Sequence, residues 1–151
     1  APLEAALYAG LSDALRARLG VRPKLSALLR DLAELDASSN ADAAHRPASA
    51  ALPELLSERH PSALVGGLYV LEGATLGGRT IARHLRRVLG DAFGAGSFLD
   101  FHGRAITTAW PSFSTALVDL ARDGALDADE AIAGALLTFR LIHERLRGDA
   151  V

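Results

Sequence analysis

Residues 62–90 read SALVGGLYVLEGATLGGRTIARHLRRVLG, and this stretch decides the fold. Its apolar residues recur at helical spacing, and Gly90 stands where such a helix would end. The pattern therefore predicts one long helix over residues 62–89. Glycines interrupt this helix at positions 66, 67, 73, 77 and 78.

Glycine is unfavourable inside a helix, by about 1 kcal/mol per residue relative to alanine. Gly73, Gly77 and Gly78 together cost about 3 kcal/mol, a large share of a typical folding free energy. Three explanations for them compete. The glycines could allow a second helix to pack closely, or form a phosphate loop after a strand at residues 68–71. The helix could also kink so that its bare backbone lies against a flat ligand.

The phosphate loop fails on detail. A P-loop requires lysine and then serine or threonine after its last glycine, whereas Arg79 and Thr80 follow Gly78. A dinucleotide-binding fold also needs several parallel strands, and the sequence offers at most one candidate. Close helix packing and contact with a ligand both remain open.

The composition predicts an all-α fold. The chain has 151 residues, which suits a single domain over residues 1–151. Half of the residues are hydrophobic, and most of these are alanine and leucine, which favour helices. The β-branched residues that favour strands are scarce.

Further helices follow from apolar periodicity. Leucines at every fourth position predict an amphipathic helix from Leu3 to Leu19, stopped by Gly20. A second stripe predicts a helix over Leu25–Leu35, with its charged residues Arg30, Asp31 and Glu34 facing away. The polar residues 37–50 predict a loop, and residues 52–58 a short helix.

The last third of the chain predicts two more helices. Residues 91–103 are rich in glycine and aromatic residues, which favours a loop before a helix over residues 107–122. Asp127 and its acidic neighbours then mark the first turn of a last helix. The apolar face of that helix comprises Ile132, Leu136, Phe139, Ile142 and Leu146.

Composition also excludes several functions. A net charge of −2 gives no general footprint for nucleic acid. The absence of cysteine excludes disulfides, thiolate metal sites and cysteine nucleophiles. No apolar run approaches the length of a membrane span, and no signal peptide is visible. The sequence therefore predicts a cytoplasmic protein that binds neither nucleic acid nor membranes.

The stretch LYVLEGATLGG, Leu68–Gly78, resembles the distal-helix motif of bacterial biliverdin-forming heme oxygenases, especially the type found beside bacteriophytochromes. Other blocks resemble the same family in the same order. They are Pro2-Leu3-Glu4, LLRDLAEL at residues 28–35, WPSF at residues 110–113, and Thr138-Phe139. The resemblance thus covers nearly the whole chain.

This resemblance implies a heme-oxygenase-like helical bundle with a kinked, glycine-rich distal helix. Gly73 and Gly77 would touch the distal face of heme, and Gly78 would relax the kink. Heme would be both cofactor and substrate, cleaved by O₂ and electrons to biliverdin, CO and Fe²⁺. Ala74 stands where some relatives carry an aspartate, so ordered water held by Thr75 or by backbone carbonyls would deliver protons.

Other contacts with heme are implied at the edges of the site. Phe101 and Phe139 are candidate walls of the heme pocket, with ordinary core packing as the alternative. Arg79 and Arg83 are candidates to pair with heme propionates, with a solvated helix face as the alternative. The arginines after the motif would also attract an acidic electron donor such as a ferredoxin, or a reductase.

The family's axial ligand to iron is a histidine on a first helix, upstream of the block that here begins at Pro2. We therefore expect that helix to precede Ala1 in the natural protein. None of the histidines of the chain occupies the ligand position; they are His45, His60, His84, His102 and His143.

The alternative is a non-catalytic relative that lacks the ligand helix. Such a protein would expose an apolar cleft, and would therefore form a homodimer or bind another protein. A thiaminase-like helical enzyme is a further alternative, against which the missing cysteine counts.

Overall fold

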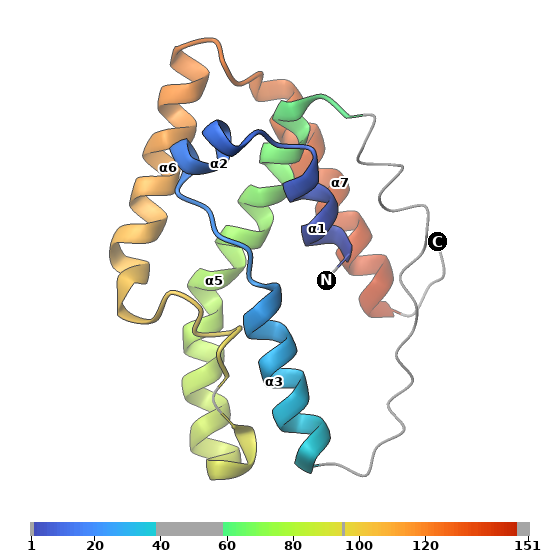
Figure 1. The fold of residues 1–151 in the computed structure, drawn as a ribbon, viewed down its shortest axis with the longest axis vertical. Helices are drawn as coiled ribbons and strands as arrows, with labels where there is room; N and C mark the ends of the chain where they lie inside the picture. The colour runs from blue at the N-terminus through green and yellow to red at the C-terminus, as the bar shows by residue number, and fades with distance from the viewer. Residues whose placement is uncertain (1, 39–58, 95, 148–151) are drawn as a thin grey trace.

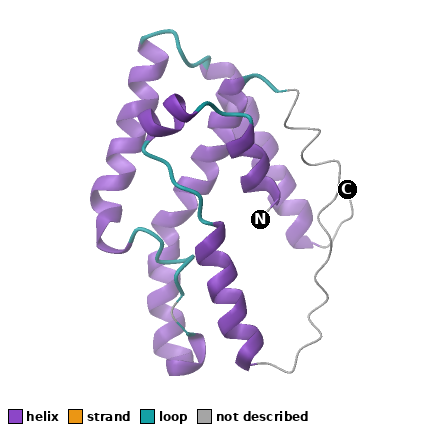
Figure 2. Ribbon diagram, viewed as in Figure 1, coloured by secondary structure: helices purple, strands orange, loops and turns teal. Residues whose placement is uncertain are grey.

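The computed structural model describes residues 2–38, 59–94 and 96–147. Over these residues the chain is helical and has no strand, which confirms the predicted all-α fold (Figure 2). The α-helices are α1 (Pro2–Ala9), α2 (Asp13–Leu19), α3 (Leu25–Ser38), α5 (Pro61–Leu89), α6 (Ile106–Arg122) and α7 (Ala128–Arg147). Two 3-10 helices, η1 (Gly90–Phe93) and η2 (Gly103–Ala105), lie between α5 and α6.

The predictions for the first half of the chain need correction in places. The single helix predicted over Leu3–Leu19 is wrong, because the chain breaks after Ala9 and restarts as α2. Ser12 causes the restart, since its Oγ accepts a hydrogen bond from the backbone N–H of Leu15 at 3.3 Å. Gly20 ends α2, as predicted, and it adopts the left-handed conformation. Most of the predicted loop, the predicted short helix and His45 lie outside the described residues.

The long glycine-containing helix is confirmed as α5, which runs without interruption from Pro61 to Leu89. The His60 ring caps its first turn by accepting a hydrogen bond from the N–H of Ser62 at 3.2 Å. Helix α5 lies in the middle of the molecule between α6 and α7, and α1, α2 and α3 lie on the near side in Figure 1.

Helices α5 and α7 pack closely enough for their backbones to touch. A Cβ added at Gly66 would fall 1.8 Å from the carbonyl oxygen of Ala131. One added at Gly134 would fall 1.9 Å from the carbonyl oxygen of Ala63. Close packing of the two helices therefore accounts for Gly66. The two helices run in the same direction, with α6 making the return between them (Figure 1).

The core is formed mainly where α1, α2, α5 and α6 meet. Its buried apolar residues include Leu7, Leu11, Leu19, Leu64, Val65, Leu68, Phe113 and Leu120. Helix α7 faces α5 with Gly134 and Thr138, both of which are buried. None of the described helices is long and apolar enough to cross a lipid bilayer.

The apolar face predicted for the last helix is mostly turned outward. The exposed fractions are 59% for Ile132, 63% for Leu136 and 57% for Phe139. A row of large apolar side chains exposed on one face is typical of an interaction surface. This face of α7 is therefore a candidate binding surface.

Candidate functional site

The glycines of α5 fall into two groups, and the first group is used for packing inside the fold. Besides Gly66, Gly67 lies against the side chain of Leu7, whose Cδ2 would be 2.5 Å from an added Cβ. At Gly78 an added Cβ would fall 2.3 Å from the carbonyl oxygen of Leu99. No larger residue fits at these positions unless the neighbouring backbone or side chain moves.

The second group comprises Gly73 and Gly77. A Cβ added at Gly77 would meet no atom of the described residues within 4 Å. At Gly73 it would reach only the Trp110 ring, at 3.6 and 3.7 Å, which is ordinary van der Waals contact. Packing within the described part of the chain therefore requires glycine at neither position, although each glycine still costs about 1 kcal/mol of helix stability.

We call the side of α5 that carries Gly73 and Gly77 its open side, and the side chains beside it are apolar. Tyr69 and Leu76 are neighbours of Gly73 on the surface of the helix, because they lie four positions before it and three positions after it. Tyr69 is 43% exposed and Leu76 is 45% exposed. The ring of Tyr69 also packs against that of Trp110 in α6, with 5.5 Å between the ring centroids. A stretch of bare backbone is thus framed by large apolar side chains.

This side of α5 continues into a groove bordered by all three long helices. The groove has a volume of about 330 Å³ and an apolar lining that includes Tyr69 of α5, Leu117 of α6, and Leu136 and Phe139 of α7. That volume lies within the range of small-molecule sites. Tyr69 is the residue that this groove shares with the side of α5 that carries Gly73 and Gly77.

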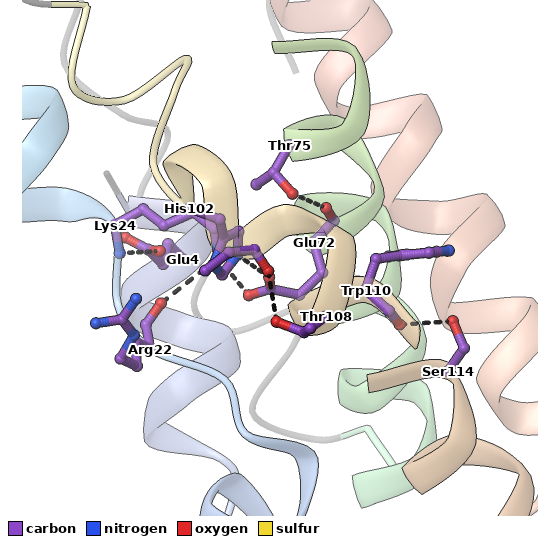
Figure 3. A network of polar contacts seen from close by, with 10 residues as sticks. Glu4, Arg22, Lys24, Glu72, Thr75, His102, Thr108, Trp110 and Ser114 are labelled. Carbon is purple, nitrogen blue, oxygen red and sulfur yellow. Dashed lines mark hydrogen bonds and ion pairs between the residues drawn. The ribbon is translucent and has the colours of Figure 1, made fainter. Parts of the chain in front are cut away.

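A buried polar network surrounds Glu72 of α5. The carboxylate of Glu72 accepts a hydrogen bond from Lys24 Nζ at one oxygen and contacts His102 Nε2, 3.0 Å away, at the other (Figure 3). The side chains of Lys24, Glu72 and His102 are only 4, 6 and 7% exposed. The backbone N–H of Lys24 also donates to a carboxylate oxygen of Glu4 at 2.7 Å.

Tyr8 of α1 borders this network. Its side-chain oxygen is buried and has no hydrogen-bond partner among the described residues. Burial, and after it the negative charges of Glu72 and Glu4, raise the pKa of Tyr8 far above its usual value. The hydroxyl therefore stays protonated in the folded protein.

The predicted site residues separate onto two sides of α5. Gly73 and Gly77 lie on its open side, and Phe139 lines the adjoining groove. Thr75 is buried, and its hydroxyl donates to the carbonyl oxygen of Glu72 at 2.6 Å. Phe101 packs near the buried network, with Lys24 Nζ 5.0 Å from its ring centroid. The structure does not bring Thr75 and Phe101 to the open side.

The remaining predicted residues are Gly78, Arg79 and Arg83. Gly78 faces the Leu99 backbone rather than open space. Arg79 donates to the carbonyl oxygen of Gly103 at 2.9 Å and lies 3.7 Å from Asp100. Arg83 is exposed. Arg79 therefore holds the segment before α6, whereas Arg83 is available to solvent.

Sequence reasoning missed the pairing of Lys24 with Glu72. One signal was present, because an acidic residue between Leu71 and Gly73 in an apolar helical stretch needs a partner if it is buried. The partner itself lies 48 positions earlier in the sequence, and periodicity does not connect residues so far apart.

Among the described residues, no group of three or more histidine and carboxylate side chains could hold a metal ion by itself. Comparisons of the chain with models of known families, with curated proteins and with solved structures find no match.

Proposed function

We propose that this protein is a heme oxygenase, which cleaves heme with O₂ and electrons to biliverdin, CO and Fe²⁺. One observation supports the proposal above the others. The two glycines of α5 that packing leaves unused, Gly73 and Gly77, are the two that the resemblance of the motif assigns to contact with heme. A flat ligand that covers them would compensate the cost of two glycines in the helix.

The residues present suit a flat, largely apolar ring. Gly73 and Gly77 are four positions apart, so their bare backbone makes a strip along one side of α5. Tyr69 and Leu76 offer apolar contact beside the strip, and Phe139 lies in the adjoining groove. Heme, when bound, supplies the activation of oxygen.

The chain contributes to the heme site its shape, the exclusion of water, and a positive charge. The absence of a side chain at Gly77 leaves space for a small molecule next to the ring, and the apolar neighbours exclude water from it. Arg83 follows Leu76 by two helical turns on the same side, where a guanidinium would pair with a propionate. A kink of α5 at the glycines, and a ferredoxin or reductase as electron donor, belong to the same proposal.

Three of the described histidines have polar partners. His60 caps α5, His102 is bonded to Glu72, and His143 Nε2 lies 3.5 Å from a guanidinium nitrogen of Arg147. Because these histidines already have partners within the chain, they favour a second candidate function, that of a protein that binds heme without cleaving it. The two candidates differ in product and not in the expected heme contact on the open side of α5.

Hemin titration of the natural full-length protein tests the proposal. We expect uptake with a Soret band, followed by the absorbance of biliverdin when a reductant and O₂ are added. Uptake without biliverdin would support the second candidate instead. A chain that takes up no hemin would exclude both.

A further inference from the structure

The backbone on the open side of α5 needs a restraint if it is to bind a flat ligand. Glycine has more backbone freedom than any other residue, and Gly73 and Gly77 lie one turn apart. No close packing of the described residues against either position restrains this turn. A flat ligand nevertheless needs one conformation of the backbone that it covers, because a misplacement of about 1 Å weakens both binding and chemistry.

Glu72 is the last residue before this turn, and both of its carboxylate oxygens are held. Lys24, between α2 and α3, bonds to one oxygen, and His102, at the start of η2, contacts the other at 3.0 Å. Figure 3 shows both side chains converging on Glu72 from segments far apart in the sequence. Because the group is buried, these hydrogen bonds compete little with water and are strong.

A hydrogen bond from a side chain to the backbone acts at the same turn. The Thr75 hydroxyl donates to the carbonyl oxygen of Glu72 at 2.6 Å, which is a back-bond known to bend helices slightly. The Thr75 hydroxyl therefore helps to fix the backbone at Glu72, where the turn from Gly73 to Gly77 begins.

The other end of the turn is held by the segment that carries His102. Gly78 lies against the Leu99 carbonyl, and Arg79 donates to the Gly103 carbonyl at 2.9 Å. The segment 96–105 thus contacts α5 just before Gly73 and just after Gly77. Between these contacts, no described residue packs closely against Gly73 or Gly77.

We propose that Glu72 is a positioning residue, which together with Lys24 and His102 holds the turn from Gly73 to Gly77 in the one conformation that the flat ligand requires. The Glu72 side chain is only 6% exposed and both of its oxygens are engaged, so it acts through the backbone and not by touching the ligand. The part that concerns the ligand rests on the proposed function, whereas the restraint of the turn does not.

Hydrogen exchange in the heme-free chain tests the restraint directly. In His102→Ala the amides of residues 73–78 should exchange about tenfold faster or more, because a buried charged group loses a partner. The amides of residues 64–70 in the same helix should keep their rates. His102→Gln, which retains an N–H donor, should restore part of the protection.

Two further variants sharpen the result. Glu72→Gln removes the charge and should accelerate the same amides, with Lys24 left without its counter-ion. Asp119→Asn, which changes an exposed ion pair on α6, is the matched control and should change nothing in α5. If Glu72→Gln does not fold, the His102 variants decide alone, because the Lys24–Glu72 pair is still present in them. Unchanged rates at residues 73–78, or equal acceleration along all of α5, would overturn the restraint.

Hemin affinity tests the ligand part. In a chain that binds hemin, His102→Ala should weaken binding about tenfold and shift the Soret band, and His102→Gln should recover much of both. Faster exchange with unchanged hemin affinity would overturn the positioning role and leave the proposed function standing. If the unaltered chain binds no hemin, the ligand part falls with the proposed function, while exchange still decides the restraint.

Discussion

Gly134 of α7 touches Ala63 of α5 so closely that a single added carbon at Gly134 would fall 1.9 Å from the Ala63 carbonyl oxygen. The contact is between backbones, since the nearest atoms of Ala63 are its carbonyl oxygen, carbonyl carbon and Cα. A backbone cannot move aside as a flexible side chain can. The distance between the two helices is therefore set by the absence of a side chain at this position.

Gly134→Ala should destabilise the fold by about 3 kcal/mol, because the added methyl group forces the two helices apart. Urea unfolding followed by circular dichroism measures the change. A loss below about 0.5 kcal/mol would mean that α5 and α7 are not held at this distance.

Gly77→Ala should have the opposite effect in the heme-free chain. The added methyl group meets no atom of the described residues, and alanine is the better helix former by about 1 kcal/mol. The free energy of unfolding should therefore rise by about that amount in the same urea experiment. A clear decrease would show that the open side of α5 is covered in solution.

Gly77→Leu should leave hemin uptake in place and reduce biliverdin formation about a hundredfold, because the side chain fills the space beside the ring. Ala17→Leu adds the same side chain at an exposed position of α2 and serves as the control. Normal turnover by the Gly77 variant would show that heme does not lie against this part of α5.

Tyr8→Phe should stabilise the protein by about 1 kcal/mol, because it removes a buried hydroxyl that has no partner among the described residues. The variant should also resist alkali better. The fold raises the pKa of Tyr8, while an unfolded tyrosine ionises near pH 10, so this residue contributes stability below about pH 10 that is lost as the pH rises further.

Urea unfolding at about pH 8 and about pH 11 checks both statements about Tyr8. The difference in stability between the two proteins should widen at the higher pH. An equal difference at both pH values would contradict the raised pKa, and a lower stability of the variant at pH 8 would show that the hydroxyl has a partner.

Asp31→Ala should release the start of the segment that leads to α6. The Asp31 carboxylate accepts the backbone N–H groups of Ser97 and Phe98, each at 2.7 Å. We expect a loss of about 1–3 kcal/mol, with faster hydrogen exchange at these two amides. Asp31→Asn keeps one acceptor oxygen and should lose less.

The same residue shows why some sequence predictions fail. Helical periodicity predicts that Asp31 faces away from the fold, yet its carboxylate binds two backbone amides 66 and 67 positions later. The expectation is wrong because helical periodicity describes polarity along one element and contains nothing about loops that return to it. The bounds of α5 depend on local signals, a proline at its start and Gly90 at its end, and were predicted to within one residue.

The sequence also does not identify the packing face of α7, for a related reason. The sequence identifies its apolar face by large side chains, whereas the face that packs on α5 carries the small residues Gly134 and Thr138. Small residues add little hydrophobicity, so periodicity does not reveal them. Likewise, the sequence places all five glycines of α5 in one category, and only tertiary distances separate Gly73 and Gly77 from the others.

The parallel pairing of α5 with α7 has a consequence for the order in which the protein folds. Ala63 meets Gly134 only after the whole of α6 has been made and has turned back along the molecule. During synthesis on the ribosome, the side of α5 that packs on α7 therefore stays unpaired until α7 has been made. Contacts between residues so far apart in the sequence slow folding. Nascent chains that end before residue 128 should depend more strongly on chaperones than chains that extend beyond residue 147.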